Sequence, residues 1–183
     1  MIVKYPDPVL RKRTKTFSTY TPEIKKTIEL LEKELRKSGT GVGLAAPQIG
    51  KSKRIFALKD HHQIKTVCNP EIISNFEREK AFPRIEQEDQ SQEDFLEGCL
   101  SFPGIYGTVK RWLRIRVKYE TLNSKDKLVK KEEELEGFLA IVFQHELDHL
   151  NGVLFVDHIK EDQGKLYKEI DNKLKKIKVS EVL

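Results

Sequence analysis

The sequence is poor in cysteine and lacks long apolar runs. Its 183 residues include only two cysteines, Cys68 and Cys99. That is too few for the disulfide framework of a small secreted domain, so we expect a reducing compartment. No apolar run reaches the roughly 18 residues that a membrane-spanning helix needs. The first residues, 1–13, contain no apolar stretch suited to a signal peptide. Without repeats or a clear linker, residues 1–183 are expected to form a single domain.

Charge, by contrast, is abundant. Charged residues make up 34% of the chain and apolar residues 38%, and the net charge is +5. This mild excess permits an anionic partner without demanding one. Residues 86–94 are acidic, polar and without periodicity, which predicts a mobile surface loop.

The first half of the chain predicts one helix followed by strands. Thr21 is suited to cap a helix that Gly39 would end. The glycine-rich segment 41–50 predicts a loop packed against the core. Residues 54–58 and 64–68 are predicted as strands, the second of which would bury Cys68 as an apolar residue.

The second half predicts two strands and two helices. Apolar residues alternate from Val109 to Tyr119 with a single break at Arg111, which favours a half-buried strand. Residues 127–135 would return as its partner, and residues 153–156 would add a short strand. Helices are predicted over 137–152 and 162–178, the latter with an apolar stripe and many lysines on its exposed side.

The helix predicted over 137–152 contains the motif His-Glu-x-x-His. His145 and His149 lie one turn apart on one helical face, as two ligands of one metal require. Glu146 would stand beside the same ion, where it could move the protons of an activated water. The flanking residues are apolar, so these polar side chains need a reason to be buried.

Two histidines leave a metal site incomplete, and the third ligand has several candidates. Phe155 occupies the position where one class of zinc proteases has a third histidine. Glu169 and Asp157 are downstream carboxylates, and either would make a zincin-type endopeptidase. Cys99 is upstream, where a thiolate would neutralise one charge of a divalent ion and leave a position open. A closed structural metal site in a ribosome-associated binding module is a further, non-enzymatic alternative.

Three segments together resemble the signature motifs of the peptide deformylase family. They are Gly41-Val42-Gly43-Leu44-Ala45-Ala46-Pro47-Gln48, Glu97-Gly98-Cys99-Leu100-Ser101 and Gln144-His145-Glu146-Leu147-Asp148-His149-Leu150. The resemblance extends over most of residues 1–160. It implies an α+β fold, with mixed and antiparallel strands packed around a central metal-bearing helix, plus an N-terminal and a C-terminal helix. It also implies removal of the formyl group from the N-terminal formyl-methionine of newly made polypeptides.

The resemblance implies a role for each motif residue. Cys99, His145 and His149 would hold a divalent metal, physiologically Fe(II), with zinc, nickel or cobalt able to occupy the same ligands. Glu146 would transfer protons. The formyl oxygen would be stabilised by the Gln48 side chain and the Leu100 N–H. The residues expected to bind substrate are Val42, Gly43, Phe138, Ile141 and Val142.

The remaining expectations concern the residues around the ligands, the binding partners and the location. Gln144 and Asp148 are candidates to support the ligands, and the alternative for Asp148 is a pair with an arginine such as Arg111 or Arg114. The lysine-rich segment 161–183 resembles the C-terminal helix by which one branch of the family docks on the ribosome. No membrane and no specific nucleic-acid sequence is expected as partner. Bacterial cytoplasm is the expected location, ahead of a trimmed organellar form or a phage-encoded one.

Overall fold

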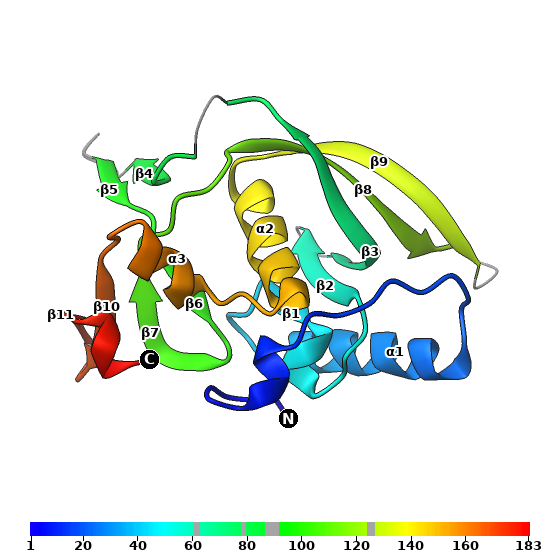
Figure 1. Cartoon of the computed structure of the whole chain (residues 1–183), viewed down its shortest axis with the longest axis horizontal. Coiled ribbons are helices and arrows are strands. Elements are labelled where there is room, and N and C mark those ends of the chain that lie inside the picture. The colour runs from blue at the N-terminus through cyan, green and yellow to red at the C-terminus, as the bar shows by residue number, and fades with distance from the viewer. Residues whose placement is uncertain (61–62, 78–79, 87–91, 124–126) are drawn as a thin grey trace.

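The computed structural model describes residues 1–60, 63–77, 80–86, 92–123 and 127–183. It has the predicted α+β class, with a central helix, α2 (Gly137–Asn151), between two antiparallel sheets. Figure 1 shows the larger sheet arching over one side of α2 and the smaller sheet standing on the other. All pairs of named strands are antiparallel, and the parallel component is an isolated bridge between Lys15 and Lys53.

The larger sheet has five strands. Their order is β1 (Gly43–Ala45), β2 (Ile55–Asp60), β3 (Gln63–Asn75), β8 (Arg114–Leu122) and β9 (Leu128–Glu136). The strands predicted over 54–58, 64–68 and 127–135 are confirmed, although β3 continues well past Cys68. Cys68 itself is fully buried, as predicted. Alternate residues of β8, such as Ile115 and Val117, pack with Phe143 and Leu147 of α2 to form one core.

Helix α1 (Pro22–Lys37) covers part of the larger sheet. The Thr21 hydroxyl accepts a hydrogen bond from Ile24 N at 3.3 Å, so the predicted N-cap is confirmed. Leu31 and Leu35 of this helix are fully buried in a second core with residues of β1 and β2. The segment predicted as a packed loop contains strand β1 and a 3-10 turn, Ala46–Ile49, all buried.

The smaller sheet has four strands. Their order is β11 (Lys173–Ile177), β10 (Leu166–Ile170), β7 (Phe102–Gly107) and β6 (Glu97–Cys99). A third core lies between this sheet and α3 (Phe155–Glu161), where Phe102 and Phe155 stack edge to face with ring centroids 5.4 Å apart. The strand predicted over 153–156 is therefore wrong, because Phe155 and Val156 already belong to α3.

The helix predicted over 162–178 is also wrong, because these residues form the hairpin β10–β11. The apolar spacing that suggests a helix instead puts Leu166 opposite Ile177, where both pack on the third core. Asp171 and Asn172 form the turn with φ of 52° and 59°, as a tight two-residue hairpin turn requires. The lysines of β11 lie on an edge strand, where charge prevents pairing with other chains.

Two further predictions need correction. The strand predicted from Val109 begins only at Arg114, because the preceding residues turn inward and bury the Arg111 side chain. In the acidic segment, β4 (Arg84–Glu86) and β5 (Gln92–Asp94) pair as a two-stranded sheet. The predicted mobility of its centre concerns residues 87–91, which lie outside the described residues.

Candidate active site

Helix α2 is delimited by two glycines and buried along most of its length. Gly137 and Gly152 have φ of 58° and 75°, so both ends use a backbone conformation that other residues rarely adopt. A Cβ atom on Gly152 would also lie 2.4 Å from the carbonyl oxygen of Arg11. The predicted end of the helix is thus confirmed, and the chain beyond it packs closely against the N-terminal segment.

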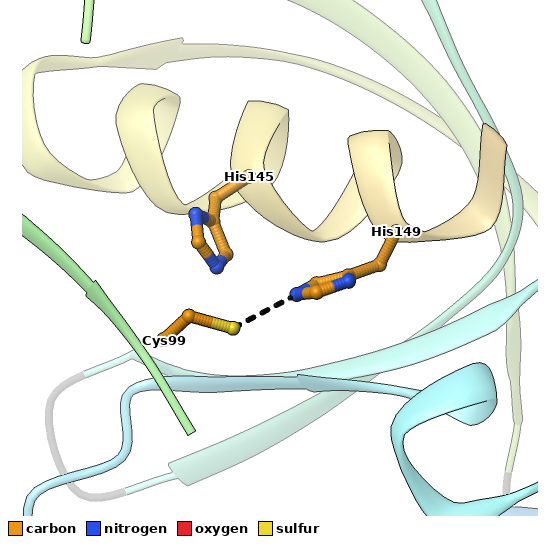
Figure 2. A group of neighbouring side chains, drawn as sticks. All are labelled: Cys99, His145 and His149. Carbon is orange, nitrogen blue, oxygen red and sulfur yellow. Dashed lines mark hydrogen bonds between the residues drawn. The ribbon is translucent and has the colours of Figure 1, made fainter. Parts of the chain in front are cut away.

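The two histidines of α2 point at the cysteine of β6. In Figure 2, His145 and His149 project from the same side of the helix toward Cys99. Sγ of Cys99 lies 3.2 Å from Nε2 of His149, and the candidate ligand atoms of all three residues lie within 4.8 Å of one another. Soft sulfur and imidazole nitrogen at this spacing are suited to one divalent transition metal.

The charges around these three residues also suit a cation. Cys99 is buried, which opposes a thiolate, but the two imidazoles against Sγ hold its pKa well below the ordinary value. His145 is buried as well, yet Cys99 and Glu97 raise its pKa well above the usual range. The pocket therefore stabilises positive charge at the point where the three side chains converge. The donor set and its surroundings fit a divalent metal.

A buried chain of charged groups supports His145. Its Nδ1 lies 2.9 Å from Oε2 of Glu97, so its other nitrogen is left to face Cys99. Arg111, only 1% exposed, donates to both Glu97 oxygens at 2.7 and 2.9 Å and to Asp148 at 2.6 Å. His158 of α3 completes the chain, 2.9 Å from Asp148.

Attraction to Arg111 decides the charge state of both acids. Burial opposes ionisation of Glu97 and Asp148, but the adjacent guanidinium lowers the pKa of each carboxyl to about 2. The predicted pairing of Asp148 is thus resolved in favour of Arg111, since Arg114 pairs with Glu134 at 2.8 Å on the surface.

Sequence reasoning missed the roles of Glu97 and His158. The usable signal was Arg111 itself, because a charged residue interrupting an apolar alternation needs a buried partner. Gln144 was expected to support a ligand, but its amide instead bonds the main chain of Trp112 and Ala140. It therefore fixes α2 against the segment that leads into β8.

Glu146 of α2 faces the same pocket. It is 3% exposed, and its Oε2 atom has no hydrogen-bond partner among the described residues. Burial raises the pKa of this carboxyl to about 7. Room for it depends on Gly43, where a Cβ atom would lie 2.3 Å from Oε1 of Glu146. A buried carboxyl that titrates near neutrality is suited to move protons.

Gln48 and the turn after Cys99 form the facing wall. The side-chain oxygen of Gln48, Oε1, accepts from Ala45 N at 2.8 Å. This bond fixes the side-chain nitrogen toward Cys99 Sγ at 3.5 Å and Ser101 Oγ at 3.2 Å. Leu100 and Ser101 form the tight turn between β6 and β7. Gln48 and Leu100 both line the pocket, and their predicted role toward the formyl oxygen stays a prediction.

A cavity of about 490 Å³ opens beside these groups. All the residues predicted to bind substrate line it, and they are Val42, Gly43, Phe138, Ile141 and Val142. Phe138 packs edge to face against Phe95, with centroids 6.0 Å apart, at the rim of this cleft. The apolar wall and the polar groups therefore belong to one site.

The other candidate ligands lie elsewhere. Asp157 accepts from Arg11 at 3.0 Å and from Leu154 N at 2.8 Å. Glu169 of β10 accepts from the Tyr106 hydroxyl at 3.3 Å. Within the described ranges, the cluster of potential ligands is Cys99, His145 and His149 alone. Neither carboxylate supplies the third ligand that an endopeptidase site would need.

Comparison with known proteins agrees with this geometry. A family model described as polypeptide deformylase matches residues 1–165. The peptide deformylase of Thermotoga maritima is 46% identical over 153 residues, covering 84% of this chain and 82% of that protein. The peptide deformylase of Desulforudis audaxviator is 41% identical over 157 residues, covering 85% and 90%.

Solved structures agree as well. The crystal structure of the Thermotoga maritima peptide deformylase matches with a TM-score of 0.70 at 42% identity, covering 86% of this chain and 95% of that one. That of the Thermus thermophilus enzyme matches with a TM-score of 0.71 at 35% identity, covering 88% and 86%. No helix in the described part of the chain is both long and apolar enough to cross a membrane. By sequence, fold and site geometry, the chain belongs to the peptide deformylase family of metallo-hydrolases.

Proposed function

We propose that this chain removes the formyl group from N-terminal formyl-methionine with a divalent metal held by Cys99, His145 and His149. The observation that carries the proposal is the convergence of these ligand atoms within 4.8 Å, beside Glu146, whose Oε2 atom has no hydrogen-bond partner in the described part of the chain. Residues 1–183 act in this proposal as one catalytic domain. The bound metal would supply Lewis-acid activation of water and of the formyl oxygen.

Glu146 is the proposed proton carrier. Its carboxylate takes a proton from the attacking water and delivers it to the departing amine nitrogen. A pKa of about 7 suits both halves of this task, because the group is then neither too weak as a base nor too weak as an acid. Gly43 keeps space open beside Oε1, so the carboxylate can face the substrate.

Gln48 and Leu100 are the proposed donors to the formyl oxygen as it gains negative charge. The bond from Ala45 N to the Gln48 side-chain oxygen holds the amide nitrogen at the pocket, where one of its contacts to Cys99 Sγ and Ser101 Oγ would give way to the formyl oxygen. The Leu100 N–H follows Cys99 directly in the chain. Loss of one such donor typically costs about 2.7–4 kcal/mol of barrier stabilisation.

The methionine side chain is proposed to enter the apolar part of the cleft. Ile141 and Val142 are 5% and 6% exposed and line the cavity with Phe138. The substrate main chain would lie along Val42 and Gly43, where a glycine permits close approach. An unbranched apolar side chain fits such a wall by dispersion and exclusion of water.

The proposed physiological metal is Fe(II). The Cys-His-His donor set also suits zinc, nickel and cobalt, because sulfur and imidazole bind all of these ions. The proposed location is bacterial cytoplasm, where Cys99 would stay reduced and formylated chains are made. Anaerobic purification with metal analysis would test the ion, and activity should follow iron content.

We propose the ribosome as a partner of the hairpin β10–β11, which stands where the sequence predicted a C-terminal helix. The supporting observation is a set of exposed lysines on and after β11: Lys173, Lys175, Lys176 and Lys178. Changing all four to Gln should weaken salt-dependent co-sedimentation with ribosomes and leave hydrolysis of a short peptide unchanged. Unchanged co-sedimentation would contradict this role. The lysines would then serve only to prevent other chains from pairing with the edge strand.

Formate release from formyl-Met-Ala-Ser tests the function directly. Wild-type protein loaded with metal should release formate, and Glu146→Ala should lose this activity while keeping stoichiometric metal. Glu132→Ala is the matched control, because Glu132 is exposed on β9. Cleavage of an internal bond in an unformylated peptide, without formate release, would overturn the proposal.

A further inference from the structure

The N-terminal segment is hydrogen-bonded to both parts of the cleft wall that Gln48 and the turn after Cys99 form. Val3 N donates to the carbonyl oxygen of Gln48 at 2.8 Å, and Tyr5 N donates to that of Ser101 at 3.0 Å. One bond thus reaches the 3-10 turn after β1 and the other the turn between β6 and β7. In Figure 1 the blue segment before η1 (Pro8–Arg11) lies beside both connections.

Packing of Val3 and Tyr5 holds the N-terminal segment in place, and with it the donors of these two bonds. Val3 and Tyr5 are half-buried and pack against the third core. The Tyr5 ring stacks on Phe102 with centroids 4.9 Å apart and an interplanar angle of 19°. Because neighbouring side chains of an extended segment point in opposite directions, Lys4 is left free to turn toward the cleft.

Lys4 reaches one particular peptide group of the site. Its ammonium donates to the carbonyl oxygen of Leu100, and the residue lines the cleft. The N–H of that same peptide group belongs to Ser101, and it points at Cys99 Sγ at 3.4 Å. The Leu100–Ser101 peptide group therefore accepts a hydrogen bond from the Lys4 ammonium through its oxygen. Its N–H donates to the sulfur of Cys99.

This arrangement has an electronic and a geometric consequence. A positive charge beside a carbonyl oxygen polarises the peptide group. The N–H of that peptide group then becomes a stronger donor to a thiolate. The bond also fixes the plane of the turn that follows Cys99, and with it the direction of the adjacent Leu100 N–H. In a mobile turn, the N–H groups of Leu100 and Ser101 would have no fixed direction.

We propose that Lys4 is a positioning residue that sets the thiolate of Cys99 and the N–H of Leu100 through the Leu100–Ser101 peptide. The part that concerns Leu100 rests on the proposed function, whereas the part that concerns Cys99 rests on the contacts alone. Supporting groups one step behind a ligand typically contribute about 10–100-fold to metal affinity or activity.

The test compares Lys4→Met and Lys4→Arg with wild type and with Lys12→Met as a matched control. Lys4→Met keeps the apolar stem and loses the ammonium, whereas Lys12 belongs to the same segment and does not line the cleft. Lys4→Met should lower kcat on formyl-Met-Ala-Ser about tenfold or more with little change in KM. Lys4→Arg should recover most of the loss, and Lys12→Met should match wild type.

A second readout does not depend on turnover. In the Co(II)-loaded protein, the sulfur-to-cobalt charge-transfer band should move to lower energy in Lys4→Met, because a thiolate with a weaker donor gives up electrons more easily. An unmoved band together with unchanged kcat would overturn the inference, as would an equal effect of Lys12→Met. If wild type released no formate, the deformylase proposal would fail, while the band shift would still decide the role of Lys4.

Discussion

Gly43 and Glu146 occupy adjoining space so tightly that a Cβ atom on the glycine would lie 2.3 Å from the carboxylate oxygen. A Cβ atom and an oxygen that are not bonded to each other do not approach so closely, so one of them must move. The glycine of the first motif is therefore matched to the glutamate of the third. Two segments far apart in the chain thus constrain each other's residue type.

Gly43→Ala should disable the enzyme without emptying the site. The added methyl group must displace Glu146, and proton transfer by a positioned side chain is typically worth about 10²–10⁴-fold. We expect kcat to fall by about 10²-fold or more with metal content unchanged. In a double-mutant cycle, adding Gly43→Ala to Glu146→Ala should cost little further activity. Fully additive losses would show that the glycine acts on something other than Glu146.

Cys99→Ser should weaken metal binding. A neutral hydroxyl replaces a thiolate, so the ion loses its one anionic ligand among the three. Metal retained after dialysis against a chelator, measured by elemental analysis, should drop sharply relative to wild type. Cys68→Ala serves as control, because Cys68 is fully buried in a core apart from the cleft. Full metal retention by Cys99→Ser would remove the cysteine from the ligand set.

Arg111→Met should destabilise the fold far more than Arg114→Met. Arg111 is 1% exposed between Glu97 and Asp148, so its loss leaves these two carboxylates with only their histidine contacts, at a cost of about 3–5 kcal/mol. Arg114 pairs with Glu134 on the surface, where such pairs contribute about 0–1 kcal/mol. Urea unfolding of the metal-free proteins would measure the difference. Similar midpoints for the two variants would contradict a buried, charge-dependent role.

Acid should weaken the metal-free protein over a defined range. The pKa of Glu97 falls from an ordinary 4.5 to about 2 in the folded state, and that of Asp148 from 3.8 to about 2. A carboxyl with a lowered pKa contributes stability above its unfolded value and loses it as pH falls through the folded value. The urea midpoint should therefore decrease between about pH 4.5 and pH 2. Arg111→Met should show a smaller decrease, because its carboxyls lack the guanidinium that lowers their pKa.

The chemistry of the site was readable from the sequence because it is concentrated in short motifs. The spacing of His145 and His149 requires only that the segment be helical, and Cys99 was the one plausible sulfur in a constrained turn. The supports were less readable. Arg111 was noticed only as a break in an alternation, and the Val3 and Tyr5 bonds use main-chain atoms, which leave no trace in residue type.

The main error of fold concerned the C-terminal segment. Leu166, Ile170, Leu174 and Ile177 have a spacing that suits one face of a helix. The same residues also satisfy a hairpin, because the turn at Asp171 and Asn172 brings Leu166 opposite Ile177. Local pattern does not choose between these, and docking of Leu166 on the third core decides it. The sequence did contain a signal for the turn, because Asp171 and Asn172 are residue types that adopt positive φ more readily than most.

The chain of charged groups from His145 to His158 joins α2 to α3, and the main-chain bonds of Val3 and Tyr5 join the facing wall of the cleft to the start of the chain. The metal ligands are thus braced by residues that span most of the polypeptide. Such a centre is not formed by any one local segment, because the contacts that join Cys99, Glu97 and Arg111 to α2 must be closed over long loops. Binding of the ion then reports folding of the whole domain, and its affinity adds to the stability of every segment that braces it.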